Sequence, residues 1–324
     1  MSARPRVVVT RRLPSAVETV LVREWDATLN TDDRPLDAAG LKQALGACDA
    51  LLCTVTDRIT ADVLAVQPLA ARILANFGVG FNHIDLAAAK ARNLVVTNTP
   101  DVLTEDTADD AVMLMLMVAR RAGEGERHVR SRSWTGWRPT HMLGTKVSGK
   151  TLGLVGMGRI ARAVAHRAHF GFGMRIVFHD PYPPPAELVK QLGAESRGSV
   201  DDVVREADFV SLHCPATPET RHLIDARRLS LMQRGAFLIN TARGDVVDEG
   251  ALVAALKAGT IRGAALDVYE REPTVTPELL TMENVVLLPH LGSATEETRV
   301  AMGLRTIENL RAFFAGRPPV DRVA

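Results

Sequence analysis

The stretch that decides the fold is Thr-Leu-Gly-Leu-Val (151–155), followed at once by Gly-Met-Gly-Arg-Ile-Ala (156–161). The first five residues are a short apolar run, which predicts a buried parallel strand. The next six form the pattern G-x-G-x-x-A and open a helical pattern. Gly156 permits a tight turn, Gly158 lets a pyrophosphate approach the backbone, and Ala161 lets the helix pack on the strand. The free N–H groups at the start of that helix can bind phosphate.

A second short strand, 175–179, ends in Asp180, 19 residues after Ala161. An acid at this place can accept hydrogen bonds from an adenosine ribose. A lone G-x-G-x-x-[GA] is a weak signal, and a glycine-rich turn without a ligand is the alternative. Because strand, turn, helix, strand and acid follow one another in the right order, we predict a dinucleotide site. Asp180 favours NAD over NADP, since an acid would repel a 2′-phosphate.

The composition is that of an ordinary globular protein. The chain has 324 residues, 46% hydrophobic and 24% charged, and its net charge is +1. At roughly 100–200 residues per domain, two domains are expected. The near-neutral charge gives no reason to expect a nucleic-acid or membrane partner. Cys48, Cys53 and Cys214 show no C-x-x-C spacing, and no signal or transmembrane segment is evident, so we expect a cytoplasmic protein without a metal site.

Strand and helix signals alternate along both halves of the chain, which predicts an α/β fold of parallel sheets with helices on both faces. Strands are expected at 6–10, 50–54, 72–76, 94–97, 151–155, 175–179, 208–213, 236–240, 263–267 and 285–288. Helices are expected at 15–25, 60–65, 86–92, 159–169, 186–192, 200–206, 225–232, 248–258 and 296–314.

A further helical pattern begins near Thr104 and is expected to run unbroken to about Arg130. Its central stretch, 111–119, is hydrophobic nearly all round, which predicts burial between layers or domains. Trp134 and Trp137 follow in a loop. We expect them to pack against a neighbouring helix or a second subunit rather than to stack on a ligand.

Arg243, Glu272 and His290 each lie just past the end of a predicted strand, where ligands of open α/β sheets bind. Singly, they have plain alternatives as a surface ion pair, a turn carboxylate and a loop histidine. Together, beside a dinucleotide site, they fit reversible hydride transfer at a carbonyl. A guanidinium can grip a carboxylate and polarise the adjacent ketone. An imidazolium can protonate the new alkoxide, and a neighbouring carboxylate stabilises that imidazolium.

The same motifs occur together in one enzyme family. The chain resembles the NAD(P)-dependent D-isomer-specific 2-hydroxyacid dehydrogenases over nearly its full length. Within the family, Trp-Thr-Gly-Trp-Arg-Pro-Thr (134–140) and the segment 51–59 most resemble glyoxylate/hydroxypyruvate reductases. The segments that match the family pattern are 51–59, 76–85, 98–109, 154–161, 213–220, 240–244 and 289–293.

The resemblance implies catalytic roles for the three residues after the strands. Arg243 would bind the substrate, Glu272 would support the histidine, and His290 would be the acid/base. In the family, the carboxylate directly before proline pairs with the histidine. This favours Glu272 over Glu270.

The resemblance also implies substrate and cofactor contacts. The backbone of Val79 and Gly80 would hold the substrate carboxylate, a use suited to the close approach that glycine allows. Thr107 and Asp267 would face the nicotinamide. For Cys214, a role as a small buried residue at a strand end is an equal alternative to a contact with the adenosine side. The expected cofactor-binding residues are Thr107, Gly156, Gly158, Arg159, Ile160, Asp180, Cys214, Pro215, Thr241, Ala242, Arg243, Asp267, His290 and Ser293.

The implied architecture has two doubly wound domains with the active site in the cleft between them. A flavodoxin-like substrate domain would consist of 1–102 plus 290–324. A Rossmann nucleotide domain, 103–289, would be inserted between these two parts. The resemblance further implies a homodimer, with 104–145 as the segment where the interface is expected.

We therefore expect an NAD(H)-dependent D-2-hydroxyacid dehydrogenase that acts as a 2-oxoacid reductase, with glyoxylate or hydroxypyruvate favoured. The substrate-side motifs resemble enzymes that often use NADP, whereas Asp180 favours NAD. Two alternatives stay open. One is 3-phosphoglycerate dehydrogenase without a regulatory domain, and the other is a non-catalytic NAD-sensing scaffold.

Overall fold

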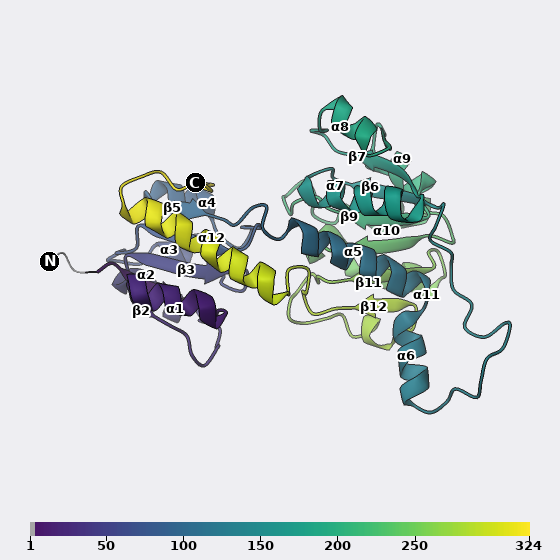
Figure 1. Cartoon of the computed structure of the whole chain (residues 1–324), viewed down its shortest axis with the longest axis horizontal. Coiled ribbons are helices and arrows are strands. Elements are labelled where there is room, and N and C mark those ends of the chain that lie inside the picture. Colours follow the sequence, from purple (N-terminus) through teal and green to yellow (C-terminus); the bar gives the residue numbers. More distant parts are fainter. Residues whose placement is uncertain (1–3) are drawn as a thin grey trace. The chain divides into compact units, whose positions relative to one another are not determined.

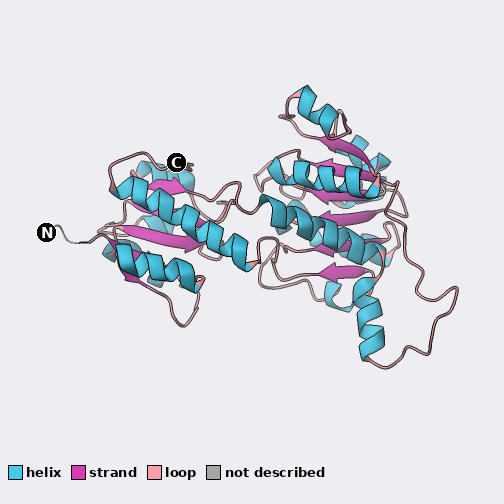
Figure 2. Cartoon of the chain, viewed as in Figure 1, coloured by secondary structure: helices cyan, strands magenta, loops and turns pink. Residues whose placement is uncertain are grey.

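The computed structural model describes residues 4–324. The chain divides into two compact units, each built on its own parallel sheet (Figures 1 and 2). Unit 1 consists of Met1–Leu103 with Ser293–Ala324, and unit 2 of Thr104–Gly292. The second boundary follows Gly292, so His290 belongs to unit 2 and not, as the sequence suggests, to the C-terminal segment of unit 1.

Unit 1 contains a five-stranded parallel sheet in the order β2-β1-β3-β4-β5, the doubly wound order of flavodoxin-like folds. Its central strands form because short apolar runs can be buried on both faces, as in β3 and β4. The strands are β1 (Arg6–Val9), β2 (Asp26–Thr28), β3 (Ala50–Thr54), β4 (Ile73–Phe77) and β5 (Val95–Thr97). The helices are α1 (Ser15–Glu24), α2 (Ala38–Ala47), α3 (Ala61–Leu64), α4 (Leu86–Ala91) and α12 (Glu296–Phe314).

The C-terminal helix α12 packs beside α1 in unit 1 (Figure 1). The two helices approach closely at Gly303, where an added Cβ would lie 2.4 Å from Val17. After the helix, Asp321 accepts hydrogen bonds from Arg305 Nε at 2.6 Å and Asn309 Nδ2 at 2.9 Å. The chain therefore returns to complete unit 1 after it has built unit 2.

Unit 2 contains a seven-stranded parallel sheet in the order β12-β11-β10-β9-β6-β7-β8. Strand β6, which precedes the glycine-rich turn, lies where the strand order reverses, the place where Rossmann folds bind dinucleotides. The strands are β6 (Thr151–Val155), β7 (Arg175–His179), β8 (Ala194–Ser196), β9 (Phe209–Leu212), β10 (Phe237–Asn240), β11 (Gly263–Leu266) and β12 (Val285–Leu287).

Two hydrophobic clusters lie on the opposite faces of this sheet. Helices α5 (Thr104–Ala119) and α7 (Arg159–His166) cover one face. Helices α9 (Val200–Glu206), α10 (Ala226–Leu231) and α11 (Glu249–Lys257) cover the other. The remaining short helical elements are α6 (Ala122–Arg130), η1 (Arg167–Gly171), α8 (Ala186–Gln191), η2 (Gly244–Val246) and η3 (Leu279–Thr281).

The predicted unbroken helix from Thr104 to Arg130 is wrong. The helix ends at Ala119, and α6 begins at Ala122 after Arg121 has turned into the left-handed region with φ +55°. The guanidinium of Arg121 then binds Glu124 at 2.6 and 2.7 Å, which ties the turn to the start of α6. Of these two helices, α5 buries apolar side chains against the sheet, whereas α6 has no buried residue.

The two tryptophans of the following loop lie on the surface of the chain. Trp134 is 54% exposed and Trp137 is 82% exposed, so neither is packed into the interior of unit 2. This exposure within residues 4–324 does not confirm the predicted packing on a neighbouring helix, and packing on a second subunit stays a prediction. None of the helices in 4–324 is both long and apolar enough to cross a membrane.

Candidate active site

The glycine-rich turn after β6 has the shape that a dinucleotide site requires. Gly156 has φ +92°, and an added Cβ would lie 2.9 Å from the carbonyl of His213, so only glycine fits. Above Gly158, by contrast, an added Cβ would meet nothing within 4 Å. This residue is the N-cap of α7 and has no side chain that could cap the helix, so no side chain of its own stands between the turn and a ligand. The turn thus fits a pyrophosphate.

Asp180 lies at the end of β7, beside this turn. One carboxylate oxygen accepts a hydrogen bond from Met157 N at 2.6 Å, and the other accepts one from Tyr182 N at 2.8 Å. The two backbone donors fix the orientation of the carboxylate next to the Gly156–Gly158 turn. An acceptor fixed in this place fits the ribose of a dinucleotide.

Arg243 follows β10 in a turn shaped by Asn240. The Asn240 side chain accepts a hydrogen bond from Ala242 N at 3.0 Å and donates one to the carbonyl of Arg243 at 2.9 Å. At the next residue, Gly244, an added Cβ would overlap the backbone of Tyr269 at 1.8 Å. The β10 turn therefore packs directly on the segment after β11. Burial lowers the pKa of Arg243, although nearby carboxylates oppose the shift.

His290 and Glu272 form a hydrogen-bonded pair. His290 Nδ1 lies 2.8 Å from Glu272 Oε2, and Glu272 Oε1 accepts a hydrogen bond from Tyr269 N at 3.0 Å. Burial alone would raise the pKa of Glu272, but the bond to His290 and the charges of His290 and Arg243 lower it. The other candidate carboxylate, Glu270, lies instead 2.9 Å from His222 Nε2. The structure thus brings Glu272, and not Glu270, to the histidine.

The turn that carries His290 has an unusual backbone, with φ +59° at the histidine itself. Asp267, at the end of β11, holds this turn with three hydrogen bonds. Its carbonyl accepts from His290 N at 3.0 Å, and its two carboxylate oxygens accept from Leu291 N at 2.6 Å and Gly292 N at 2.9 Å. Thr107 of α5 donates to the carbonyl of Gly292 at 2.9 Å. Both Asp267 and Thr107, which sequence reasoning assigns to the nicotinamide, therefore also position the histidine.

Of the remaining predicted cofactor residues of unit 2, Arg159 and Ile160 begin α7, and the others follow the ends of β9 and β10. The backbone N of Cys214 would be 3.0 Å from a Cβ at Gly156, so this residue borders the glycine-rich turn. Burial raises the pKa of the Cys214 thiol to about 11, which keeps it protonated. The carbonyl of Pro215 accepts a hydrogen bond from Thr220 at 2.6 Å. The Thr241 hydroxyl is buried and has no partner within 4–324.

In unit 1, two asparagines that sequence reasoning missed hold the loop after β4. Asn76 Nδ2 donates to the carbonyls of Gly78 and Gly80 at 3.0 Å each, and Asn98 Nδ2 donates to the carbonyl of Val79 at 2.9 Å. In a trans peptide the N–H points opposite to the carbonyl. The N–H groups of Val79 and Gly80 therefore point away from the two amides. Ser293, the last predicted cofactor residue, is half-buried and begins the C-terminal segment of unit 1.

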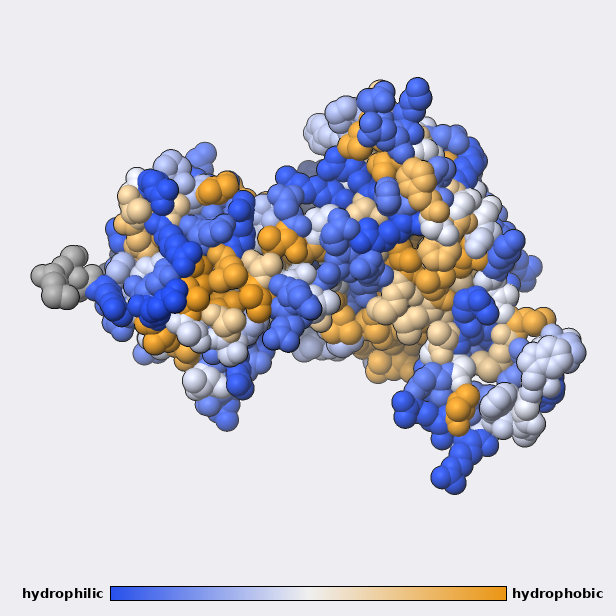
Figure 3. All heavy atoms as spheres, viewed as in Figure 1, coloured by the Kyte–Doolittle hydropathy of each residue, from blue (hydrophilic) through white to orange (hydrophobic). Residues whose placement is uncertain are grey.

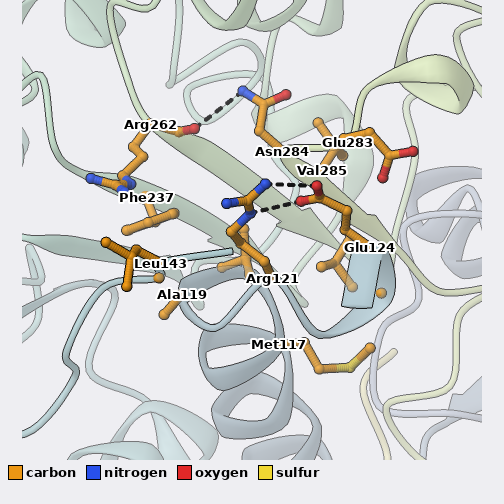
Figure 4. A pocket seen from close by; sticks show the side chains of 14 residues that line it. Met117, Ala119, Arg121, Glu124, Leu143, Phe237, Arg262, Glu283, Asn284 and Val285 are labelled. Atoms are coloured by element: carbon orange, nitrogen blue, oxygen red, sulfur yellow. Dashed lines mark hydrogen bonds and ion pairs between the residues drawn. The ribbon is translucent and has the colours of Figure 1, made fainter. Parts of the chain in front are cut away.

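A cavity of about 240 Å³ in unit 2 is separate from these residues (Figure 4). It is lined by Phe237 and Val285, the first residues of β10 and β12, whereas Arg243 and His290 follow the carboxyl ends of the same strands. Its rim includes the Arg121–Glu124 ion pair drawn in Figure 4. None of the predicted catalytic residues lines it.

Comparisons with known proteins agree with this arrangement. Residues 112–292 match the family model described as the NAD-binding domain of D-isomer-specific 2-hydroxyacid dehydrogenases. A glyoxylate reductase of Korarchaeum cryptofilum is 46% identical over 99% of this chain and 96% of its own length. One from Thermococcus kodakarensis is 45% identical over 98% of this chain and 95% of its own length.

A solved structure extends the likeness to the whole fold. It is that of an NADPH-dependent glyoxylate/hydroxypyruvate reductase from Sinorhizobium meliloti, in complex with NADP and malonate. It is similar to this chain with a TM-score of 0.88 and 35% sequence identity, covering 99% of this chain and 97% of its own. The chain therefore belongs to the D-isomer-specific 2-hydroxyacid dehydrogenases, nicotinamide-dependent oxidoreductases that act on CH–OH groups.

Proposed function

We propose that this protein is an NAD(H)-dependent reductase of small 2-oxoacids, foremost glyoxylate and hydroxypyruvate, with His290 as the acid/base. The observation that carries this proposal is the His290–Glu272 pair at 2.8 Å. The pair lies in the same unit as Arg243 and the glycine-rich turn, and all of them follow the carboxyl ends of strands of one sheet. The curated relatives that are called glyoxylate reductases support the choice of substrate.

Each catalytic side chain has a defined role in this proposal. The nicotinamide cofactor supplies the hydride when it is bound. Arg243 is a permanent cation that binds the carboxylate of the substrate and polarises its ketone. His290 gives a proton from Nε2 to the new alkoxide, because its other ring nitrogen, Nδ1, faces Glu272. Glu272 favours the imidazolium through its negative charge.

We further propose that the N–H groups of Val79 and Gly80 bind the substrate carboxylate. Asn76 and Asn98 support this role, because they engage the carbonyls of Gly78, Val79 and Gly80 and so direct the adjacent N–H groups away from themselves. Oriented backbone N–H groups of this kind bind anions in many proteins.

For the cofactor we propose NAD rather than NADP. Asp180 supports this choice, because two backbone N–H groups hold its carboxylate in place and a 2′-phosphate would meet a fixed negative charge. The Sinorhizobium meliloti relative is described as NADPH-dependent, so family membership alone does not decide the matter. The other cofactor contacts in this proposal are Thr107, Gly156, Gly158, Arg159, Ile160, Cys214, Pro215, Thr241, Ala242, Asp267 and Ser293.

One set of assays tests the proposal. NADH and NADPH oxidation are measured with glyoxylate, hydroxypyruvate, pyruvate, phenylpyruvate and 3-phosphohydroxypyruvate. We expect the highest kcat/KM with NADH and one of the first two acids. A preference for 3-phosphohydroxypyruvate would favour a phosphoglycerate dehydrogenase, and no turnover with any of the acids would favour an NAD-sensing scaffold.

We also propose that two copies of the chain associate through the segment 104–145. Apolar side chains gather on the face of unit 2 where α5 lies (Figure 3). Beyond α5, the segment exposes Val129, Trp134, Trp137 and Leu143, each more than half exposed. Light scattering on the wild type and on W134S/W137S tests this proposal. We expect twice the chain mass for the wild type and a shift toward the monomer for the double variant.

A further inference from the structure

Asp110 is a buried acid that none of the proposed catalytic steps uses. It lies on α5, one turn after Thr107, and only 6% of its surface is exposed. Both carboxylate oxygens are buried, and no hydrogen-bond donor in 4–324 reaches either of them. A buried charge without a partner is costly, so the site must compensate for it or keep the group neutral.

The polar neighbour of Asp110 is another carboxyl group, that of Asp267. The two side chains lie within hydrogen-bonding reach of each other, and His290 is close enough to act on Asp110 through its charge. Two ionised carboxylates are both acceptors, so a hydrogen bond between Asp110 and Asp267 requires that one of them be protonated. Of the other charged groups on α5, Glu105 and Asp109 bind Arg167 on the exposed side of the helix, and Asp106 lies half-buried one turn before Asp110.

The hydrogen bonds of Asp267 decide where that proton resides. Burial raises the pKa of Asp267 too, but its two oxygens accept from the backbone N–H groups of Leu291 and Gly292, and these bonds oppose the shift because they favour the ionised form. Asp110 has no comparable donors. Burial and the charge of Asp267 raise the pKa of Asp110 to about 7, against the opposing charge of His290. Below about pH 7 the proton therefore lies on Asp110, and Asp267 is the anion.

We propose that Asp110 is a positioning residue for His290: its protonated carboxyl donates a hydrogen bond to Asp267 and keeps that side chain bound to the turn after the histidine. Asp267 holds His290 in its left-handed conformation through the backbone of the turn. Asp110 acts on the reaction only through this support. The inference rests on the proposed role of His290.

Two variants separate a donated hydrogen bond from simple filling of space. The amide of Asp110→Asn can donate to Asp267 as the protonated acid does, whereas Asp110→Ala cannot. We expect D110A to lower kcat about tenfold with little change in KM, because one hydrogen bond to a charged group is lost. D110N should restore kcat to within a few-fold of the wild type. A D110A enzyme with wild-type kcat would overturn the proposal, and so would a D110N enzyme as slow as D110A.

A stability measurement tests whether Asp110 is protonated in the folded chain, and it requires no enzyme turnover. Because Asp110 has a higher pKa in the folded chain than in the unfolded chain, the wild type loses stability as the pH rises from about 4 to about 7. D110N has no such titration. The Tm of D110N minus that of the wild type should therefore rise between pH 5 and pH 7 and then level off.

Asp109→Asn is the matched control, because the neighbouring carboxylate is exposed and bound to Arg167. Its Tm difference from the wild type should show no such rise between pH 5 and pH 7. A flat difference for D110N over that range would show that Asp110 holds no proton in the folded chain and would overturn the inference. Because this measurement needs no substrate, a failure of the proposed 2-oxoacid reduction leaves it intact.

Discussion

Gly156 and His290 both have left-handed backbones beside the same sheet, with φ +92° and +59°, but they are held by opposite means. At Gly156, sterics decide: a side chain would meet the His213 carbonyl, so the residue must be glycine. At His290, hydrogen bonds decide: Asp267, which precedes it by 23 positions in the sequence, holds a residue that is not glycine in the conformation that glycine prefers.

The difference teaches how each turn can be recognised. A steric requirement produces a local sequence signal, here the glycine pattern of six consecutive residues. A conformation held by hydrogen bonds from residues distant in the sequence produces no such local signal. The histidine turn depends on side chains from α5 and the end of β11, which become neighbours only in the folded chain.

The largest effect should come from breaking the histidine turn at its centre. His290→Ala removes the proton donor and should lower kcat/KM about 10³-fold, while the Kd for NADH changes little. Steady-state kinetics and NADH fluorescence titration measure the two quantities. His290→Asn is the matched control, because asparagine tolerates a left-handed backbone. It should be as inactive as the alanine variant, and substantial activity in either variant would contradict the role of His290.

Breaking the glycine turn should affect the cofactor first. Gly156→Ala forces a side chain against the His213 carbonyl and imposes a positive φ on alanine, a strain of about 1–3 kcal/mol. If that strain falls on the bound conformation, the Kd for NADH should rise between about fivefold and 150-fold. Calorimetric titration with NADH checks this. Gly171→Ala, where an added Cβ meets nothing within 4 Å, should bind NADH normally. Unchanged binding by G156A would contradict the assignment of the turn.

A smaller effect is expected from Glu272→Gln. The amide keeps the shape of the side chain but removes the negative charge that stabilises the imidazolium. We expect kcat for reduction to fall about tenfold, the scale of a hydrogen bond to a charged group. Glu270→Gln is the control, because that carboxylate faces His222 instead. Equal losses in the two variants would contradict the special role of Glu272.

The smallest effect should be seen at Asp180. Asp180→Asn removes a negative charge from the glycine turn but keeps an oxygen that can accept from Met157 N. The ratio of kcat/KM for NADPH to that for NADH should rise about fivefold, as expected for about 1 kcal/mol of repulsion in water. Parallel assays with the two cofactors measure the ratio. A ratio unchanged from the wild type would mean that Asp180 does not select the cofactor.

Much of the fold could be predicted from the sequence, because buried parallel strands are continuous apolar runs. The strands that were missed, β2 and β8, are three residues long, lie at sheet edges and keep polar side chains exposed. They have no apolar run to reveal them, since only pairing with the neighbouring strand defines them. The break between α5 and α6 was missed because Arg121, unlike glycine or proline, gives no signal of a helix end.

The candidate site divides in the same way. Arg243, Glu272 and His290 could be found because each follows a recognisable strand. Asp110 lies inside an apolar helix, and its only signal was an acid next to the hydrophobic stretch 111–119. Asn76 and Asn98 act on a loop through their side-chain amides, and such contacts depend on the fold of unit 1 rather than on any local spacing.

The return of α12 to unit 1 has a consequence for the order of events during synthesis. Unit 2 is one continuous segment, Thr104–Gly292, so all of it is synthesised before the segment Ser293–Ala324. The core of unit 1 includes Val17, whose partner Gly303 is synthesised only after the whole of unit 2. Because domains fold as units during synthesis, unit 2 should fold first. The N-terminal part of unit 1 can complete its core only after α12 has been synthesised.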